Sequence, residues 1–170
     1  MANKYLAMAA GLIKEVEALV TSSGASDAGK LIALDSSGKI DESVLPTGIG
    51  AETKTLPASE ALSAGDFINF WDDSGTLKVR KADASTTGKQ ADGFVLAAVD
   101  TDANATVYTA GINNQLTSLT GGPVMFLSAS TAGDATATAP GASGNVVQQV
   151  GIRLSATEIA FEPSRPVELA

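Results

Sequence analysis

The second half of the chain contains the stretch GGPVMFLSASTAGDATATAPGASGNVVQQVGIRLSATEIAF at residues 121–161, and residues 64–109 repeat its pattern. In both stretches a glycine turn precedes an apolar run, and a second turn leads into another short strand. A strand centred on glycine follows, and a fourth strand closes the unit. Each stretch therefore predicts the same order of turns and strands.

The offset between the two stretches is steady, at 57 positions from Gly65 to Gly122 and 58 positions from Gly93 to Gly151. Such an offset predicts two copies of one unit. A sheet of four short strands can bury its apolar face only if another surface packs against it. A second copy of the unit supplies that surface. We therefore expect one compact all-β domain, sandwich-like or barrel-like, at residues 57–164. The alternative, that any β-rich chain has glycine turns at loosely regular spacing, stays open.

The composition excludes several classes of site. The 170 residues include no cysteine and no histidine, which excludes disulfides, thiolate or imidazole metal ligands and the commonest general base. The formal charge of −8 is spread along the chain and argues against a nucleic-acid partner. No stretch approaches the length of a membrane span, so no membrane partner is expected. Aromatic residues make up only 5% of this alanine-rich chain, so its core is thin and self-assembly is a plausible remedy.

Residues 1–22 predict an N-terminal amphipathic α-helix, because apolar side chains recur three and four positions apart between residues 3 and 20. The apolar face is wider than a two-stranded coiled coil needs, which favours a three-helix bundle or docking onto another surface. Burial inside the chain's own domain is the alternative. The side chains that we expect at such an interface are Leu6, Leu12, Ile13, Val16 and Leu19.

Residues 23–56 predict a β-hairpin joint followed by a connector. Short apolar segments at 31–34 and 39–40 flank the turn sequence DSSG at 35–38, whose glycine suits a left-handed position. A joint of this kind has no core of its own and is more easily stabilised between chains than alone. Pro163 and Pro166 cannot continue a central strand, so the tail at 165–170 predicts a surface extension.

The sequence predicts neither catalysis nor a bound cofactor or metal. Residues 24–30 nearly match a phosphate-binding loop, but Leu31 stands where a magnesium-binding hydroxyl is needed. The pair at 72–73 precedes a glycine turn, where aspartate is favoured for backbone hydrogen bonds. Residues 100–104 imitate the start of a calcium loop without its later glycine and glutamate, so a weak structural calcium stays the alternative. We therefore expect a protein that is not an enzyme.

Two parts of the chain resemble a known class of proteins. The segment DAGKLIALDSSGKIDESVLP at 27–46 looks like one that recurs in tailed-bacteriophage fibre and head-fibre proteins. Residues 122–129, 137–140 and 146–164 resemble β-modules of phage capsid-decoration and fibre proteins. The resemblance implies a homotrimer on the outer surface of the virion, with the major capsid protein as its partner. It implies no catalytic residues.

These observations favour a structural virion protein that decorates or cements the capsid. We expect its capsid-facing end at residues 1–50, with the repeated β-units projecting outward. A tail-fibre or receptor-binding subunit of the same kind of virus is the first alternative. A carbohydrate-binding β-domain is the second, and its few candidate aromatic platforms are Trp71, Tyr108 and Tyr5.

Overall fold

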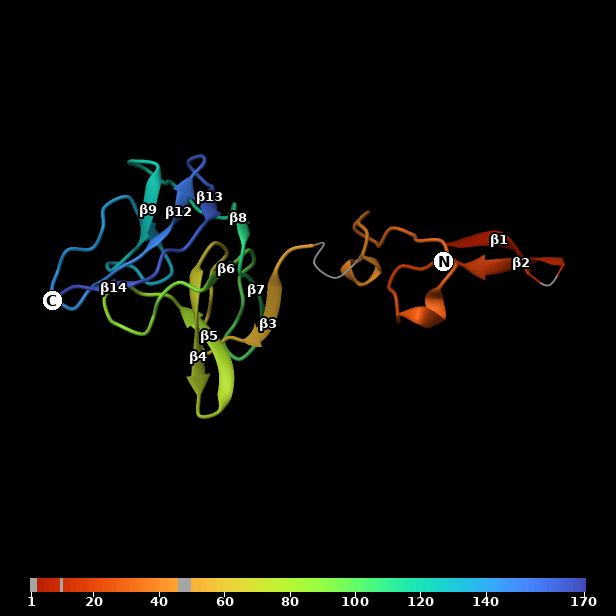
Figure 1. Ribbon diagram of the computed structural model, residues 1–170, viewed down its shortest axis with the longest axis horizontal. Coiled ribbons are helices and arrows are strands. Elements are labelled where there is room, and N and C mark those ends of the chain that lie inside the picture. Colours follow the sequence, from red (N-terminus) through yellow and green to blue (C-terminus); the bar gives the residue numbers. More distant parts are fainter. Residues whose placement is uncertain (1–2, 10, 46–49) are drawn as a thin grey trace. The chain divides into compact units, whose positions relative to one another are not determined.

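The structure is a computed structural model, and it describes residues 3–9, 11–45 and 50–170 (Figure 1). The chain divides into two compact units, residues 1–50 and residues 51–170, which we call the N-terminal unit and the β-unit. The structure is mainly β, as the sequence predicts. Its described residues form no α-helix and only two 3-10 turns, η1 (Ala25–Asp27) and η2 (Glu42–Val44). Residues 1–2 and 10 of the predicted helix and 46–49 of the predicted connector lie outside the described residues.

The predicted helix at 1–22 is wrong, because this segment forms an antiparallel β-hairpin of β1 (Lys4–Ala9) and β2 (Leu12–Glu17). Gly11 precedes β2 with a φ of 77°, a left-handed conformation that favours glycine. Inside a helix the same glycine would cost about 1 kcal/mol relative to alanine. β-branched and aromatic side chains on both sides of it favour strands over a helix.

The predicted hairpin at the joint is also corrected. Its turn forms, because the Asp35 N–H donates to the Lys39 carbonyl at 2.8 Å and the Gly38 N–H donates to the Asp35 carbonyl at 3.1 Å. The flanking segments form no strand pair with each other. Instead Leu19 pairs with Ile32 in a parallel bridge and occupies the backbone groups that a hairpin partner would need.

The β-unit begins with a five-stranded antiparallel sheet in the order β3-β7-β6-β4-β5. Its strands are β3 (Thr53–Pro57), β4 (Phe67–Asp73), β5 (Thr76–Lys81), β6 (Gly93–Val95) and β7 (Asn104–Tyr108). Beyond β3 the chain returns to β5, where Ala58 bridges Val79 and the Ser59 N–H donates to the Val79 carbonyl at 2.8 Å. The sheet therefore curls around a first core. This core consists of Leu56, Ala58, Leu62, Ile68, Val79, Val95, Ala105 and Val107.

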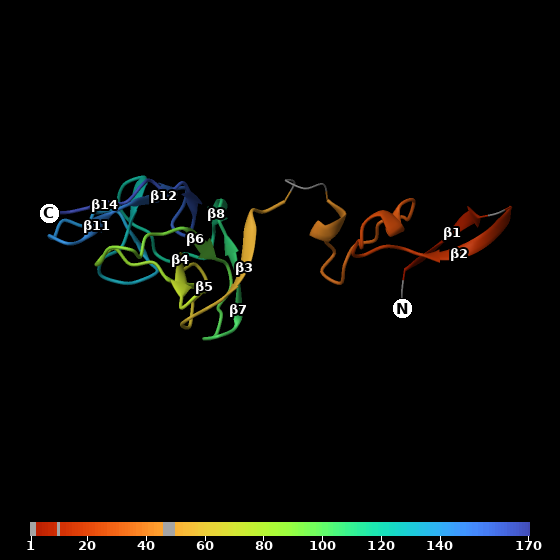
Figure 2. The same ribbon diagram turned by 60° about the horizontal axis from the view of Figure 1, so that its bottom comes forward.

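A second five-stranded antiparallel sheet follows in the order β10-β9-β12-β13-β8. Its strands are β8 (Gly111–Asn113), β9 (Val124–Leu127), β10 (Ala135–Thr136), β12 (Gln149–Arg153) and β13 (Ile159–Phe161). A two-stranded ladder of β11 (Val146–Val147) and β14 (Val167–Glu168) ties the tail to the chain before β12 (Figure 2). The tail is therefore paired with another strand, although Val167 and Glu168 are exposed.

The two sheets have the same strand order and an equivalent register. In each sheet the strand before the repeat, β3 or β8, pairs with its last strand, β7 or β13. Ile68 lies opposite Gly93 in the first sheet, and Met125 lies opposite Gly151 in the second. Two copies of one unit would give this arrangement, and each copy would begin one strand earlier than the sequence pattern indicates.

A second core lies between the two sheets. Phe161 of the second sheet stacks on Phe67 of the first, with ring centroids 5.8 Å apart, and meets the edge of Phe94 at 5.5 Å. The buried members of this core are Phe67, Ala82, Ala84, Ala91, Phe94, Leu116, Leu119, Met125, Leu127, Val150, Ile159 and Phe161. Both cores belong entirely to the β-unit.

Candidate assembly surface

The N-terminal unit exposes its apolar side chains. Of its described residues, 3–9, 11–45 and 50, none is buried wherever burial is assigned. Burying one leucine or isoleucine side chain is worth roughly 1.5 to 3 kcal/mol. The unit therefore presents a surface that a partner could cover with a large gain. Its exposed large hydrophobic side chains are Leu6, Met8, Leu12, Ile13, Val20, Leu31, Ile32, Leu34 and Ile40.

The hairpin divides the predicted interface residues between two faces. Alternation along β1 and β2 places Leu6 and Ile13 on one face, where Met8 lies directly opposite Ile13. Leu12 and Val16 lie on the other face. Leu6, Leu12 and Ile13 are 73%, 65% and 71% exposed, whereas Val16 is partly buried. The helical spacing predicted one apolar face, whereas the hairpin divides the apolar side chains between two faces. The ion pair of Lys4 and Glu15 shares the first face, and Lys14 shares the second.

The fifth predicted interface residue, Leu19, lies beyond the hairpin and is partly buried. Its N–H donates to the Leu31 carbonyl at 2.8 Å, and its carbonyl accepts from the Ala33 N–H at 2.8 Å. Leu19 therefore joins the hairpin to the loop that follows. No sequence pattern indicates this pairing, because the two partners are distant along the chain and neither belongs to a regular strand.

Both long edges of the hairpin are open. Within the described residues, β1 and β2 pair only with each other. A two-stranded hairpin is marginally stable on its own, and its unpaired N–H and C=O groups form a template for further strands. Exposed apolar side chains on both faces and two open edges suit a segment that is completed by other chains.

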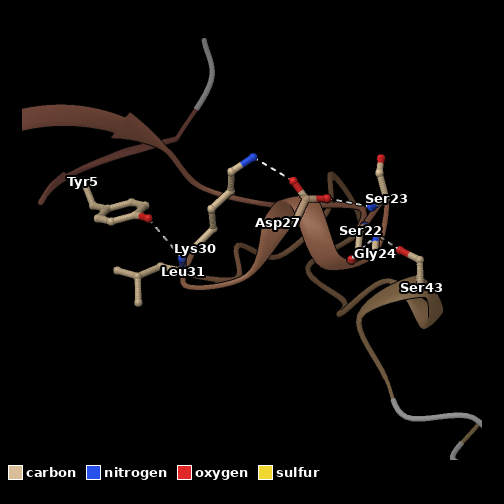
Figure 3. A network of polar contacts seen from close by, with 8 residues as sticks. All are labelled: Tyr5, Ser22, Ser23, Gly24, Asp27, Lys30, Leu31 and Ser43. Carbon is tan, nitrogen blue, oxygen red and sulfur yellow. Dashed lines mark hydrogen bonds and ion pairs between the residues drawn. The ribbon is translucent and has the colours of Figure 1, made fainter. Parts of the chain in front are cut away.

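Polar contacts, rather than a core, hold the loop after the hairpin (Figure 3). The Tyr5 hydroxyl accepts from the Leu31 N–H at 3.3 Å. The Asp27 carboxylate binds the Lys30 ammonium at 2.7 Å and accepts from the Ser23 N–H at 2.6 Å. The Lys30 ammonium, followed by that N–H, lowers the pKa of Asp27. Lys30, the lysine of the phosphate-loop-like sequence, is thus paired within its own loop.

Two further contacts in Figure 3 involve Ser22. Its N–H donates to Ser43 Oγ at 2.8 Å, and its Oγ accepts from the Gly24 N–H at 3.1 Å.

The β-unit contains a polar cleft of about 640 Å³ where the two sheets meet. Asp66 and Lys81 form an ion pair there at 3.0 Å, and Asp134 lines the same cleft. Partial desolvation in the cleft and the nearby Asp66 carboxylate raise the pKa of Asp134, and Lys81 opposes this shift. No sequence pattern indicates that these residues meet, because Asp66 and Lys81 come from the first repeat and Asp134 comes from the second. Hydroxyl side chains make up much of the remaining lining, among them Ser63, Thr117, Ser118, Thr120, Thr131, Thr136 and Thr138.

We expect Asp134→Asn to stabilise the β-unit at neutral pH. The raised pKa means that the folded state disfavours the ionised carboxyl, so the wild-type protein carries a penalty above that pKa. Asp134 is exposed, so solvent screening limits the gain to less than about 1 kcal/mol. The gain should disappear below about pH 4, where the carboxyl is protonated in both states. Urea unfolding of both proteins at neutral and acidic pH measures it. A gain that persists at low pH, or a loss at neutral pH, would contradict the assignment.

The aromatic side chains considered as sugar platforms are already engaged within the chain. The Arg80 guanidinium lies 4.9 Å from the centroid of the Trp71 ring, and the Trp71 indole N–H donates to Ser59 Oγ at 3.2 Å. Tyr108 stacks on Phe94 with centroids 5.5 Å apart. Trp71 and Tyr108 are thus held by contacts within the β-unit, and a carbohydrate-binding role stays an alternative.

The loop that imitates a calcium site is held by the backbone. Asp102 has a φ of 63°, and its N–H donates to the Ala58 carbonyl at 2.8 Å. In the part of the chain that the structure describes, no three acidic side chains lie close enough together to hold a metal ion. Nor does any described helix have the length and apolar character needed to cross a membrane.

Comparison of the chain with protein-family models, with curated proteins and with solved structures finds no match in any of the three. The most distinctive feature of the chain is the contrast between its two units. The N-terminal unit exposes its apolar side chains, whereas the β-unit has two cores.

Proposed function

We propose that the chain is a structural virion protein that decorates the outer capsid surface of a tailed bacteriophage. It acts as a homotrimer and is attached to the major capsid protein by its N-terminal unit. The exposed apolar surface of that unit carries the proposal, because an unpartnered surface of this kind marks an interaction site. The resemblance of residues 27–46, 122–129, 137–140 and 146–164 to phage head-fibre and decoration proteins supplies the class of partner.

The two-sided hairpin suits a double role in such an assembly. One face, with Leu6, Met8 and Ile13, and the opposite face, with Leu12 and Val16, can each bury apolar surface. In a trimer on a shell, one face meets the other copies and the other face meets the capsid. The open edges of β1 and β2 allow strand pairing between chains in addition.

The β-unit then forms the part that projects from the shell. Its two cores are closed within one chain, so its fold needs no surface from the capsid. Its cleft is lined mainly by hydroxyl side chains and carries one lysine paired with a carboxylate. This chemistry fits a surface that faces solvent.

Two measurements test the proposal. The purified chain is mixed with capsids and, separately, with tails of the virus that encodes it, both prepared without this protein, and binding is measured by co-sedimentation. We expect saturable binding to capsids and none to tails. Immunogold labelling of intact virions should decorate heads. Binding or labelling confined to tails would contradict the proposal and favour the tail-fibre alternative.

A further inference from the structure

Two segments of the chain form the walls of the polar cleft in the β-unit. The first wall is residues 115–121, between β8 and β9, and the second wall comes from residues 131–138, which contain the turn into β10. Asp66, just before β4, and Lys81, the last residue of β5, also line the cleft. The volume of about 640 Å³ lies within the range of roughly 300 to 1,000 Å³ that is typical of small-molecule sites.

Hydrogen bonds within the chain hold both walls in place. The Gly133 carbonyl accepts from the Phe67 N–H at 2.8 Å, and the Gly133 N–H donates to the Ala82 carbonyl at 2.7 Å. The second wall is therefore joined to the first sheet. On the first wall, the Arg153 guanidinium donates to the Gly121 carbonyl at 2.7 Å. The cleft is thus largely preformed, as small-molecule sites usually are.

The first wall presents polar side chains to the cleft because its apolar side chains are buried elsewhere. Leu116 and Leu119 belong to the core between the two sheets. The polar residues beside them, Thr117, Ser118 and Thr120, are exposed and line the cleft. Ser118 has a φ of 55°, which is uncommon for a residue other than glycine, and such backbone conformations concentrate at functional sites.

Six hydroxyl groups that line the cleft form no hydrogen bond with any described residue. Each of them can donate one hydrogen bond and accept two. An apolar ligand would remove water from these groups without replacing its hydrogen bonds, whereas a ligand that both donates and accepts can pair with them. The six groups belong to Ser63, Thr117, Ser118, Thr120, Thr131 and Thr138.

The charged side chains of the cleft add acceptors. The Asp66 side chain is only 9% exposed, and its Oδ2 binds the Lys81 ammonium at 3.0 Å and accepts from the Ser63 N–H at 2.8 Å. Asp66 Oδ1 accepts no hydrogen bond from a described residue, and the Asp134 carboxylate has no partner among those residues either. Two carboxylates beside one ammonium disfavour an anionic ligand. A ligand that donates several hydrogen bonds would pair with both carboxylates.

We propose that the polar cleft of the β-unit binds a short uncharged saccharide through hydroxyl, carboxylate and ammonium groups. Saccharide hydroxyls donate and accept, which matches the carboxylates, the Lys81 ammonium and the six free hydroxyls. No aromatic side chain lines the cleft, so stacking contributes nothing, and we expect a Kd of about 1 mM. The site lies within the β-unit, so saccharide binding does not depend on attachment to a capsid.

NMR spectra of the nitrogen-15-labelled full-length chain, free of capsids, test the proposal. The probes are maltotriose, cellotriose, mannotriose and triacetylchitotriose, each added up to about tenfold above the expected Kd. At least one of them should shift the amide signals of residues 115–121 and 131–138 saturably. Putrescine, a diamine without hydroxyl groups, should not. No response to any of the saccharides, shifts confined to the surroundings of Trp71, or saturable shifts with putrescine alone would overturn the proposal.

Substitutions of matched shape then test which groups hold the saccharide, with circular dichroism to confirm folding. Thr117→Val combined with Thr120→Val removes two hydroxyls and should weaken binding at least about fivefold. Asp134→Asn removes a charged acceptor and should weaken binding by a similar factor. Thr76→Val, at the exposed start of β5, is the control and should bind normally. Unchanged binding by both cleft variants would overturn the proposal. Because no capsid is present, the result is independent of whether the chain binds one.

Discussion

Leu12→Asp combined with Val16→Asp is expected to abolish binding to capsids, with a loss of affinity of at least about 100-fold. Both side chains lie on one face of the β1–β2 hairpin. If that face is covered in the assembled state, two unpaired charges become buried, and each costs on the order of several kcal/mol. A loss of about 2.7 kcal/mol already corresponds to the stated factor. Co-sedimentation with capsids across a range of protein concentrations measures it.

The free chain should tolerate these two substitutions. Leu12 is 65% exposed and Val16 touches no core, so the thermal unfolding of the β-unit should not change. Leu77→Asp, another exposed apolar position outside the hairpin, is the matched control and should bind capsids normally. Normal binding by the double variant would show that this face of the hairpin is not covered on the shell.

Gly151→Ala is expected to destabilise the β-unit by about 3 kcal/mol or more. Gly151 has a φ of 152°, which side-chain-bearing residues rarely adopt, and a Cβ there would collide with the Ala160 carbonyl oxygen. Strained backbone costs roughly 1 to 3 kcal/mol and overpacking roughly 1 to 3 kcal/mol more. Because native proteins are stable by only about 5 to 15 kcal/mol, this is a large fraction. Urea unfolding followed by tryptophan fluorescence measures the change.

Two other glycines calibrate that result. Gly93, the equivalent position in the first sheet, would place a Cβ 2.7 Å from the Tyr108 carbonyl oxygen without a positive φ, so Gly93→Ala should be destabilising to a smaller extent. A Cβ at Gly122 would meet no atom within 4 Å, so Gly122→Ala should stay within about 0.5 kcal/mol of the wild type. If the three variants were equally stable, the close approach at the glycine-centred strands would be disproved.

The strands of the β-unit were predictable because local signals agree with long-range pairing. In the glycine-centred third strand of each repeat, a Cβ at Gly93 or Gly151 would collide with a backbone carbonyl oxygen of the neighbouring strand. Both glycines belong to the pattern that the sequence repeats. The cleft with Asp66 and Asp134 was not predictable, because its members meet only when the second sheet packs on the first.

The N-terminal segment shows where periodicity fails. Apolar side chains spaced three and four residues apart between positions 5 and 20 fit one face of a helix. The same positions also fit two short strands that are joined by a turn. Gly11 carried the information that decides between these structures, since it takes a left-handed conformation that a helix does not use. Of the five side chains predicted at an interface, Leu6, Leu12 and Ile13 are exposed in the hairpin, whereas Val16 and Leu19 are partly buried, and their role at an interface stays a prediction.

Backbone amide exchange on the full-length protein, free and bound to capsids, tests most directly whether the N-terminal unit makes the attachment. Strands β1 and β2 have open edges and no core beneath them in the free chain, so their amides should exchange rapidly. On the capsid we expect strong protection at residues 4–17, while the turns around Gly88 and Gly144 exchange as before. Unchanged exchange at 4–17 together with new protection at those turns would contradict the account and place the β-unit against the shell.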